Sequence, residues 1–397
     1  MSEGGFSAAR LERMRASLMR HVESGEVPGL VALVCRRGEV HVETLGSLAF
    51  DGRPVRRDSI FRIASLTKPI TAAAAMILVE ECRLRLDEPV EEWLPELANR
   101  QVLRRIDGPL DDSVPAARPI TLRDLLTFRL GHGAVMVWPP QFPIQHAMLE
   151  AGISPSADLP GLPADELMRR YGSLPLLHQP GEKWLYSGGS DILGVLIARV
   201  SGQSLGSFLR ERLFEPLGMK DTGFHVPEAK LDRLVTAYRG EPAGLAVFDE
   251  AGGGRFTRPP AFESGAGGLV STADDYLAFC RMLLNQGRGP QRILSRRSVE
   301  LMTTDHLTPE QLADRDARAI LGDHRGWGFG LAVTLRRAEL FETPGRFGWD
   351  GGYGTSAYTD PAEQMIGVLM TQRLMDSPQP PRVFLDFWNS AYQAIDD

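Results

Sequence analysis

The sequence predicts an α+β protein in which an antiparallel β-sheet is flanked by helices and carries an inserted all-helical lobe. Strand patterns lie near both ends of the chain, at residues 29–45 and 328–371, and helical patterns fill the middle. The chain has 397 residues, more than one core of about 250–300 residues usually holds. We therefore expect a discontinuous sheet domain from residues 1–82 and 266–397, and a mostly helical lobe from residues 83–265.

The sheet domain is predicted to begin with an amphipathic helix followed by a hairpin. The helix is indicated by apolar residues at helical spacing, namely Leu11, Met14, Leu18 and Val22. Gly29–Cys35 and Glu39–Leu45 are predicted as strands, with a turn at Arg37-Gly38. The short turn favours antiparallel pairing of the two strands.

A second helix is predicted from Leu66 to Cys82, directly after the segment Phe61–Ser65. The segment that follows Pro69 is rich in alanine, the best helix former. Proline has no amide proton and is tolerated only in the first turn of a helix. Ser65 is therefore expected at or beside the N-terminus of this helix.

The middle of the chain alternates helical patterns with proline-rich loops. Helices are predicted at Leu122–Leu126, Asp165–Tyr171, Ser190–Val200 and Leu205–Arg212. Residues 131–163 are rich in proline and also hold Trp138, Phe142 and Met148. Because linkers seldom carry so many large apolar groups, we expect a structured flap here rather than a disordered segment.

The last part of the chain returns to strand patterns and closes with a helix. The predicted strands are Gly328–Leu335, Arg346–Asp350, Ser356–Asp360 and Gln364–Thr371. The final helix is predicted at Val383–Ala394. These strands complete the sheet begun near the N-terminus, and the two terminal helices cover it.

Composition and motif content exclude several classes of protein. The net charge of −7 argues against a nucleic-acid surface. Cys35, Cys82 and Cys280 are widely spaced, and we expect them to be reduced core residues. No C-x-x-C or H-E-x-x-H spacing occurs, so neither a metal site nor another cofactor is expected. No apolar stretch approaches about 20 residues and no apolar signal region begins the chain, so we expect no membrane span and a cytoplasmic location.

The segment from Ser65 to Lys68 has the pattern of an activated nucleophile. Residues three apart share one face of a helix, which brings the hydroxyl and the amine within hydrogen-bond reach. A lysine can activate a serine only if its amine loses a proton, and an arginine cannot do so. Only four of the 44 basic residues are lysine: Lys68, Lys183, Lys220 and Lys230. Because the chain so strongly prefers arginine, a lysine at position 68 favours the catalytic interpretation over a capping serine beside a solvated lysine.

At this point the chain resembles the serine β-lactamase and penicillin-recognising superfamily, most closely its class C β-lactamase-like branch, which includes the family VIII carboxylesterases. The resemblance spans about residues 7–395 and implies a sheet domain, a helical lobe and a site in the cleft between them. It rests on motifs in the family's order: Phe61–Thr71, Ile120–Thr127, Tyr186-Ser187-Gly188, Gly265–Asp275 and Trp349-Asp350-Gly351-Gly352.

The resemblance also implies roles for individual residues. Tyr186 would be the partner of Lys68 in proton transfer, although the sequence leaves open which of the two takes the first proton. The amides of Ser65 and Gly352 would form the oxyanion hole, where one donor contributes roughly 3–4 kcal/mol to catalysis. The alternatives are a structural tyrosine and a glycine-rich hairpin turn.

Two departures from the β-lactamase pattern bear on the substrate. Gly188 stands where the family carries an asparagine that binds a substrate amide, and Trp349 stands where it carries a lysine that anchors a carboxylate. Both changes favour neutral esters. We expect the substrate to contact Gly188, Trp349, Asp350, Gly351 and Tyr353, together with Trp138 and Phe142 of the flap.

The sequence thus predicts a serine hydrolase that cleaves small-molecule carboxylic esters through an acyl-enzyme on Ser65. No G-x-S-x-G is present, which excludes the α/β-hydrolase elbow as the source of the nucleophile. A β-lactamase or D-amino-acid-specific peptidase on the same fold is one alternative, and an acyltransferase is another. A non-catalytic binding protein is the alternative from a different class. The oligomeric state is not predicted.

Overall fold

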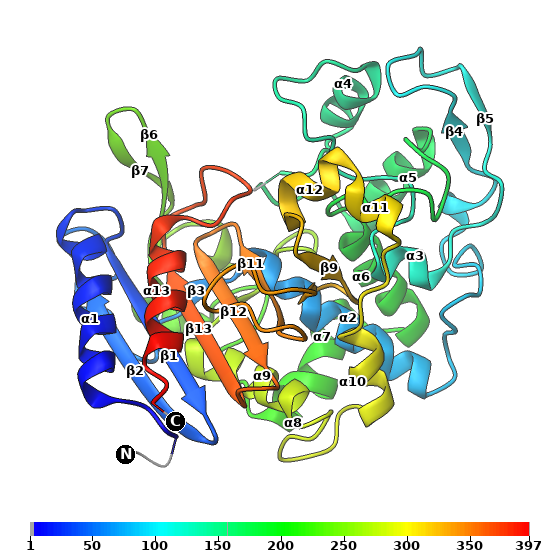
Figure 1. The fold of residues 1–397 in the computed structure, drawn as a ribbon. Helices are drawn as coiled ribbons and strands as arrows, with labels where there is room; N and C mark the ends of the chain where they lie inside the picture. Colours follow the sequence, from blue (N-terminus) through cyan, green and yellow to red (C-terminus); the bar gives the residue numbers. More distant parts are fainter. Residues whose placement is uncertain (1–3, 157, 397) are drawn as a thin grey trace.

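The computed structural model describes residues 4–156 and 158–396. Residues 1–3 and 397, at the ends of the predicted sheet domain, and residue 157, inside the predicted flap, lie outside the described residues. Figure 1 shows a central sheet with the terminal helices on one side and a group of helices on the other. The predicted α+β class with a flanked antiparallel sheet is confirmed. The predicted domain boundaries stay a prediction.

The central sheet has seven strands in the order β2-β1-β13-β12-β11-β10-β9, and each neighbouring pair is antiparallel. The strands are β1 (Gly29–Arg36), β2 (Glu39–Gly46), β9 (Arg325–Trp327), β10 (Ala332–Thr334), β11 (Phe347–Gly351), β12 (Thr355–Asp360) and β13 (Met365–Thr371). β1 pairs with β13, so the two ends of the chain build one sheet, as the strand patterns predicted.

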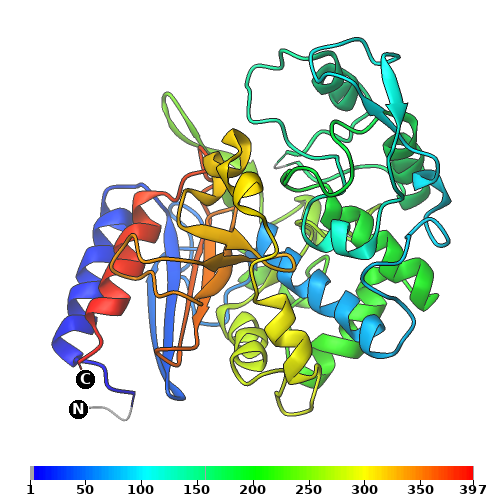
Figure 2. The same cartoon turned by 45° about the vertical axis from the view of Figure 1, so that its right-hand side comes forward.

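The terminal helices α1 (Ala8–Glu23) and α13 (Arg382–Gln393) pack together against one face of this sheet (Figures 1 and 2). Successive residues of a strand point to opposite faces. Leu30 and Ala32 accordingly pack with the terminal helices, whereas Val31 and Leu33 join the core on the other face. On that second face, α9 (Ala273–Leu284) lies against the sheet.

The inserted lobe positions the segments that surround the site. Its helices are α3 (Leu122–Leu126), α4 (Pro143–Glu150), α5 (Ala164–Ser173), α6 (Gly189–Ser201), α7 (Leu205–Leu209) and α8 (Glu215–Leu217). Two strand pairs correct the expectation of an all-helical lobe: β4 (Gln101–Leu103) with β5 (Ser113–Pro115), and β6 (Ala237–Glu241) with β7 (Gly244–Asp249). These strands are short and partly exposed, so their sequences lack a clear apolar alternation.

Three helices follow α9 in the chain and precede β9: α10 (Arg296–Met302), α11 (Pro309–Ala313) and α12 (Arg315–Leu321). The single strand predicted at Gly328–Leu335 is wrong in its first half, because residues 328–331 form the turn of a β9–β10 hairpin. Gly330 adopts a φ of 70° there, which favours glycine. Among the described residues no single helix meets the length and hydropathy needed to cross a membrane, and one sharply bent helix pair meets them only jointly.

The cysteine prediction holds for two residues and fails for the third. Cys35 and Cys280 are free and buried, as expected. Cys82 is free but exposed, so its assignment to the core was wrong. It lies just beyond α2 (Thr67–Glu80), where the chain turns at the surface.

Candidate active site

Ser65 lies at the junction between a short strand and a buried helix. Strand β3 (Phe61–Arg62) pairs with β8 (Val270–Ser271), and the 3-10 turn Ala64–Leu66 then leads directly into α2. Ala64 takes a left-handed φ of 43°, which turns the chain from the strand into the helix. As the spacing predicted, the Lys68 Nζ donates a hydrogen bond of 2.8 Å to the Ser65 Oγ.

Lys68 is held by the protein on more than one side. Its side chain is 2% exposed, and its Nζ also donates to the carbonyl oxygen of Ala266 at 2.7 Å. Burial lowers the pKa of the Lys68 amine to about 7, although the charge of Asp191 acts in the opposite direction. A neutral amine is therefore well populated near pH 7, which is the form that accepts a proton from serine.

Tyr186 approaches the same serine from the loop before α6. Its hydroxyl oxygen accepts a hydrogen bond of 2.7 Å from the Trp349 Nε1 and is also hydrogen-bonded to Ser65. The Lys68 Nζ lies 4.8 Å from the centre of the phenol ring. Burial raises the pKa of Tyr186 to about 12, even though the hydrogen bonds with Ser65 and Trp349 act in the opposite direction. The structure thus brings together Ser65, Lys68 and Tyr186, the three residues predicted to carry the chemistry.

An aromatic cluster fixes the position of the phenol. Its members lie within edge or tilted ring contact of one another: Phe128, Trp184, Tyr186, Trp327 and Trp349. Trp349 is 5% exposed and does not line the cavity described below. The ring of Trp349 packs against Tyr186 and its N–H donates to the phenol, so the predicted contact of Trp349 with the substrate stays a prediction.

A cavity of about 490 Å³ opens above the serine. The end of β11 lies close to the serine turn, that is, the turn that carries Ser65. A β-carbon at Gly351 would collide with the Ile63 carbonyl oxygen. The Thr355 hydroxyl donates a hydrogen bond of 3.2 Å to the same oxygen. Gly352 lines the cavity, and a β-carbon there would meet nothing within 4 Å. The backbone of Gly352 therefore faces open space on the same cavity as Ser65, and the predicted oxyanion hole stays a prediction.

The other predicted substrate contacts divide into two groups. Gly188 and Tyr353 line the cavity. Asp350 does not, because its carboxylate accepts hydrogen bonds from Ser356 at 2.6 Å and Tyr358 at 3.2 Å instead. Gly351 is absent from the lining as well, since it packs against the serine turn.

The predicted flap contributes its second half to the cavity. The lining residues from this segment fall between 149 and 161, with Ala134 added. Trp138 is 79% exposed and Phe142 packs against the main core, so neither lines the cavity. Both were chosen from the sequence for size alone, and size does not say which way a side chain points in a loop.

Sequence reasoning missed several buried polar residues around the cavity. Asp191 on α6 and Ser264 line it, and so does Tyr171 on α5. His132 lies beside Tyr171 with a ring-centre distance of 4.9 Å, and burial lowers its pKa to about 3. An acidic residue five positions after Tyr186, in the first turn of an otherwise apolar helix, was the available signal for Asp191.

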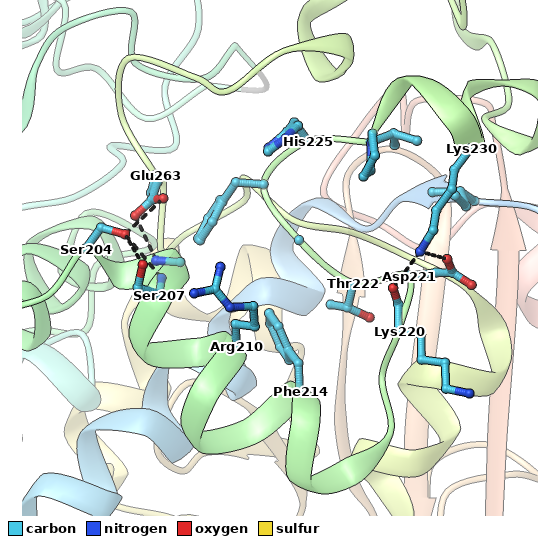
Figure 3. A pocket seen from close by; sticks show the side chains of 16 residues that line it. Ser204, Ser207, Arg210, Phe214, Lys220, Asp221, Thr222, His225, Lys230 and Glu263 are labelled. Atoms are coloured by element: carbon cyan, nitrogen blue, oxygen red, sulfur yellow. Dashed lines mark hydrogen bonds and ion pairs between the residues drawn. The ribbon is translucent and has the colours of Figure 1, made fainter.

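A second cavity, of about 260 Å³, lies between α7 and the segment leading to β6 (Figure 3). Its serines Ser204 and Ser207 bond to each other rather than to a lysine, at 3.2 Å. Of its two lysines, Lys220 and Lys230, the second is paired with Asp221 at 2.7 Å. No serine–lysine pair like that of the first cavity is present among its described lining residues. The described residues also contain no group of three or more His, Cys, Asp and Glu side chains placed to hold a metal ion.

Comparisons with known proteins agree with this geometry. Protein Rv1367c of Mycobacterium tuberculosis is 39% identical over 376 residues, which cover 92% of this chain and 91% of that protein. Esterase EstB of Burkholderia gladioli is 32% identical over 407 residues, covering 94% and 92%. The solved structure of EstCE1, described as a hydrolase with promiscuous acyltransferase activity, matches with a TM-score of 0.82 at 26% identity, covering 97% and 98%.

The sequence profile of one family spans most of the chain. The Beta-lactamase profile matches residues 14–383, a range that includes the serine turn, the Tyr186 loop and all seven strands of the sheet. The resemblance drawn from the motifs is therefore confirmed. The chain belongs to the Beta-lactamase family, in its class C-like branch, and has the fold of that family's serine hydrolases.

Proposed function

We propose that the protein is a carboxylic ester hydrolase that forms an acyl-enzyme on Ser65. The observation that carries the proposal is the 2.8 Å hydrogen bond between the Lys68 Nζ and the Ser65 Oγ at the floor of an open cavity. A serine hydroxyl needs such a base to become nucleophilic near neutral pH.

The pKa values favour one division of labour between the two partners of the serine. Lys68, with its pKa lowered to about 7, is the better proton acceptor, and Tyr186, with its pKa raised to about 12, stays protonated. Lys68 would take the proton as Ser65 attacks the ester carbonyl. Tyr186 would give its proton to the departing alcohol and recover one from the lysine, and the Ser65 oxygen, to which both groups are hydrogen-bonded, would relay it.

Hydrolysis of the acyl-enzyme would then reverse these roles, with water as the attacking group and Ser65 as the leaving group. A water molecule loses a proton to the neutral Lys68 amine as it attacks the acyl carbonyl, and Ser65 recovers a proton as the acid leaves. In both halves the developing oxyanion would accept hydrogen bonds from the amides of Ser65 and Gly352, which share the cavity.

The charges around the cavity favour a neutral substrate. Among its described lining residues Lys68 is the only lysine or arginine, and that amine is engaged with Ser65 and Ala266. Asp158 and Asp191 also line the cavity. A substrate carboxylate, as in a β-lactam or a stem peptide, would find no free cation here. The name of EstB, an esterase, supports the same choice.

An acyltransferase is the second candidate, because EstCE1 is described as a hydrolase with acyltransferase activity. The two activities share the acyl-enzyme and differ in whether water or an alcohol receives the acyl group. Product analysis with a short-chain ester, in the presence and absence of a primary alcohol, separates them. Mainly transesterified product at modest alcohol concentration would favour the acyltransferase.

A substrate panel tests the proposal. The purified protein is expected to hydrolyse p-nitrophenyl butyrate efficiently and nitrocefin poorly, and Ser65→Ala is expected to abolish butyrate hydrolysis. Undiminished turnover by the Ser65→Ala variant would reject the assignment of the nucleophile. Efficient nitrocefin turnover without esterase activity would instead favour a β-lactamase or peptidase.

A further inference from the structure

Asp191 is a buried carboxylate that lines the cavity but takes no part in the proton transfers proposed for Lys68 and Tyr186. It lies in the first turn of α6, is 8% exposed and lines the cavity. Its Oδ1 accepts hydrogen bonds from the Ser264 hydroxyl at 2.6 Å and from the Ala266 amide at 3.0 Å. Burial raises the pKa of this carboxyl, while the hydrogen bonds from Ser264 and Ala266 and the charge of Lys68 act in the opposite direction. Burying a carboxylate costs folding free energy unless hydrogen bonds or a cation compensate for it, so a functional role for Asp191 would account for its position.

The hydrogen bonds of Asp191 lead directly to Lys68. The Ala266 amide donates to Asp191, while the carbonyl of the same residue accepts from the Lys68 Nζ at 2.7 Å. Ser264 adds a second tie, because its hydroxyl also accepts from the Gly267 amide at 3.1 Å. Asp191 therefore fixes residues 264–267, and that segment fixes the lysine amine opposite Ser65.

Asp191 also supplies a negative charge that acts on the lysine. The groups that face Lys68 are the Ser65 hydroxyl from the serine turn, the Tyr186 phenol from its loop and Asp191 from α6. Of these, only Asp191 is a carboxylate. Tyr171 on α5 faces Asp191 in turn. Burial alone would drive the lysine toward permanent neutrality, and a neighbouring carboxylate opposes this.

We propose that Asp191 is the positioning residue for the Ser65–Lys68 pair: it orients the Ala266 carbonyl that holds the amine, and its negative charge keeps the lysine able to bind a proton as well as release it. The inference deepens the proposed ester hydrolysis and rests on it for its catalytic meaning. A lysine that cannot hold a proton cannot return one to Tyr186 after each transfer, so both halves of the reaction would slow.

The first test measures Lys68 directly and does not depend on activity. The chain has four lysines, so ¹³C labelling of the lysine side chains gives few NMR signals, and the Lys68→Arg variant assigns the one of interest. In Asp191→Asn, which retains the hydrogen-bond acceptor and removes the charge, the pKa of Lys68 is expected to fall by about 1 unit. A change below roughly 0.3 unit would overturn the proposal even if the protein is an esterase.

Asp275 offers a matched control. It is also 8% exposed, lies in the first turn of α9, and accepts from the Asp221 amide at 2.7 Å and the Thr222 hydroxyl at 2.9 Å. Asp275→Asn is expected to leave the pKa of Lys68 unchanged. An equal shift in both variants would mean that any buried acid acts on the lysine and would contradict a specific role for Asp191.

The second test uses the pH dependence of kcat/KM with a p-nitrophenyl ester. In Asp191→Asn the acidic limb is expected to move to lower pH while the plateau and kcat fall about tenfold, because a less basic lysine is a poorer proton acceptor. A lower plateau with an unmoved limb would indicate a merely structural role and reject the proposal. If Asp191→Asn does not fold, Ser264→Ala replaces it. The Ser264 hydroxyl stabilises the charged form of Asp191, so its removal makes the carboxyl less negative. The acidic limb of the pH profile is then expected to move to lower pH by a smaller amount, and an unmoved limb would reject the proposal.

Discussion

The nucleophile corner, defined as Ser65, Lys68, Tyr186 and Asp191, and the flap at residues 131–163 line one cavity but are built differently. Corner side chains are tied to segments far apart in the sequence, and Lys68 is 2% exposed. The flap contributes mostly loop residues, and one of its lining side chains, Leu149, is 43% exposed. This difference suggests that the proton chemistry depends on a packed core, whereas the substrate range depends on a loop wall.

The largest expected effect comes from the corner. Lys68→Arg keeps the positive charge but introduces a group that does not lose its proton, so kcat is expected to fall by about 10³-fold or more. Lys230→Arg at the second cavity, where arginine can keep the ion pair with Asp221, is the control and is expected to retain activity. Steady-state kinetics of the two variants measure the difference. Comparable activity of both would remove Lys68 from the mechanism.

The pH profile tests the same corner without a mutation. Lys68 acts in its neutral form and has a pKa of about 7, so kcat/KM is expected to be full above that pH and to fall about tenfold per pH unit below it. The pKa of Tyr186, raised to about 12, keeps the phenol protonated on the alkaline side. A profile that stays flat between pH 5 and 8 would contradict a lysine base.

Substitutions in the aromatic cluster test whether residues that contact Tyr186 also contribute to the rate. Tyr186→Phe removes the proton donor and is expected to lower kcat by about 10²-fold. Trp349→Phe preserves an aromatic ring and removes only the hydrogen bond of 2.7 Å to the phenol, so a loss of about tenfold is expected. Single-turnover kinetics check both values. An unchanged rate in Trp349→Phe would show that the indole N–H does not matter to the phenol.

The smallest effects are expected at the flap. Leu149→Ala removes a side chain that lines the cavity, so KM for a butyrate ester is expected to rise several-fold with little change in kcat. Trp138→Ala removes a side chain that is 79% exposed and outside the lining, so neither constant is expected to change appreciably. A larger effect at Trp138 than at Leu149 would reverse this assignment and indicate that the flap closes over the substrate.

The same contrast explains what the sequence predicted. Local periodicity placed β1 and the helix after Ser65, because each pattern reflects burial of its own element. The Ser65–Lys68 hydrogen bond followed from helical spacing. The contact between Asp191 and residues 264–267, by contrast, joins distant segments and has no local pattern.

The side-chain directions that the sequence did not predict have the same origin. Trp349 was expected at the substrate because it stands where the family carries a lysine that anchors a carboxylate, whereas its ring packs against Tyr186 and Trp327. Trp138 was assigned by size within a loop whose path no periodicity fixes. The sequence predicts elements and short-range pairs well, whereas side-chain direction depends on tertiary packing.

Mass spectrometry of the trapped acyl-enzyme tests the central claim most directly. The protein is mixed with a slowly hydrolysed ester, quenched in acid, and mapped by peptide analysis beside the Ser65→Ala variant. The account predicts an increase in mass equal to the acyl group, confined to the peptide that contains Ser65 and absent from the variant. An adduct on another residue, or ester turnover with no adduct and no loss in the variant, would contradict it.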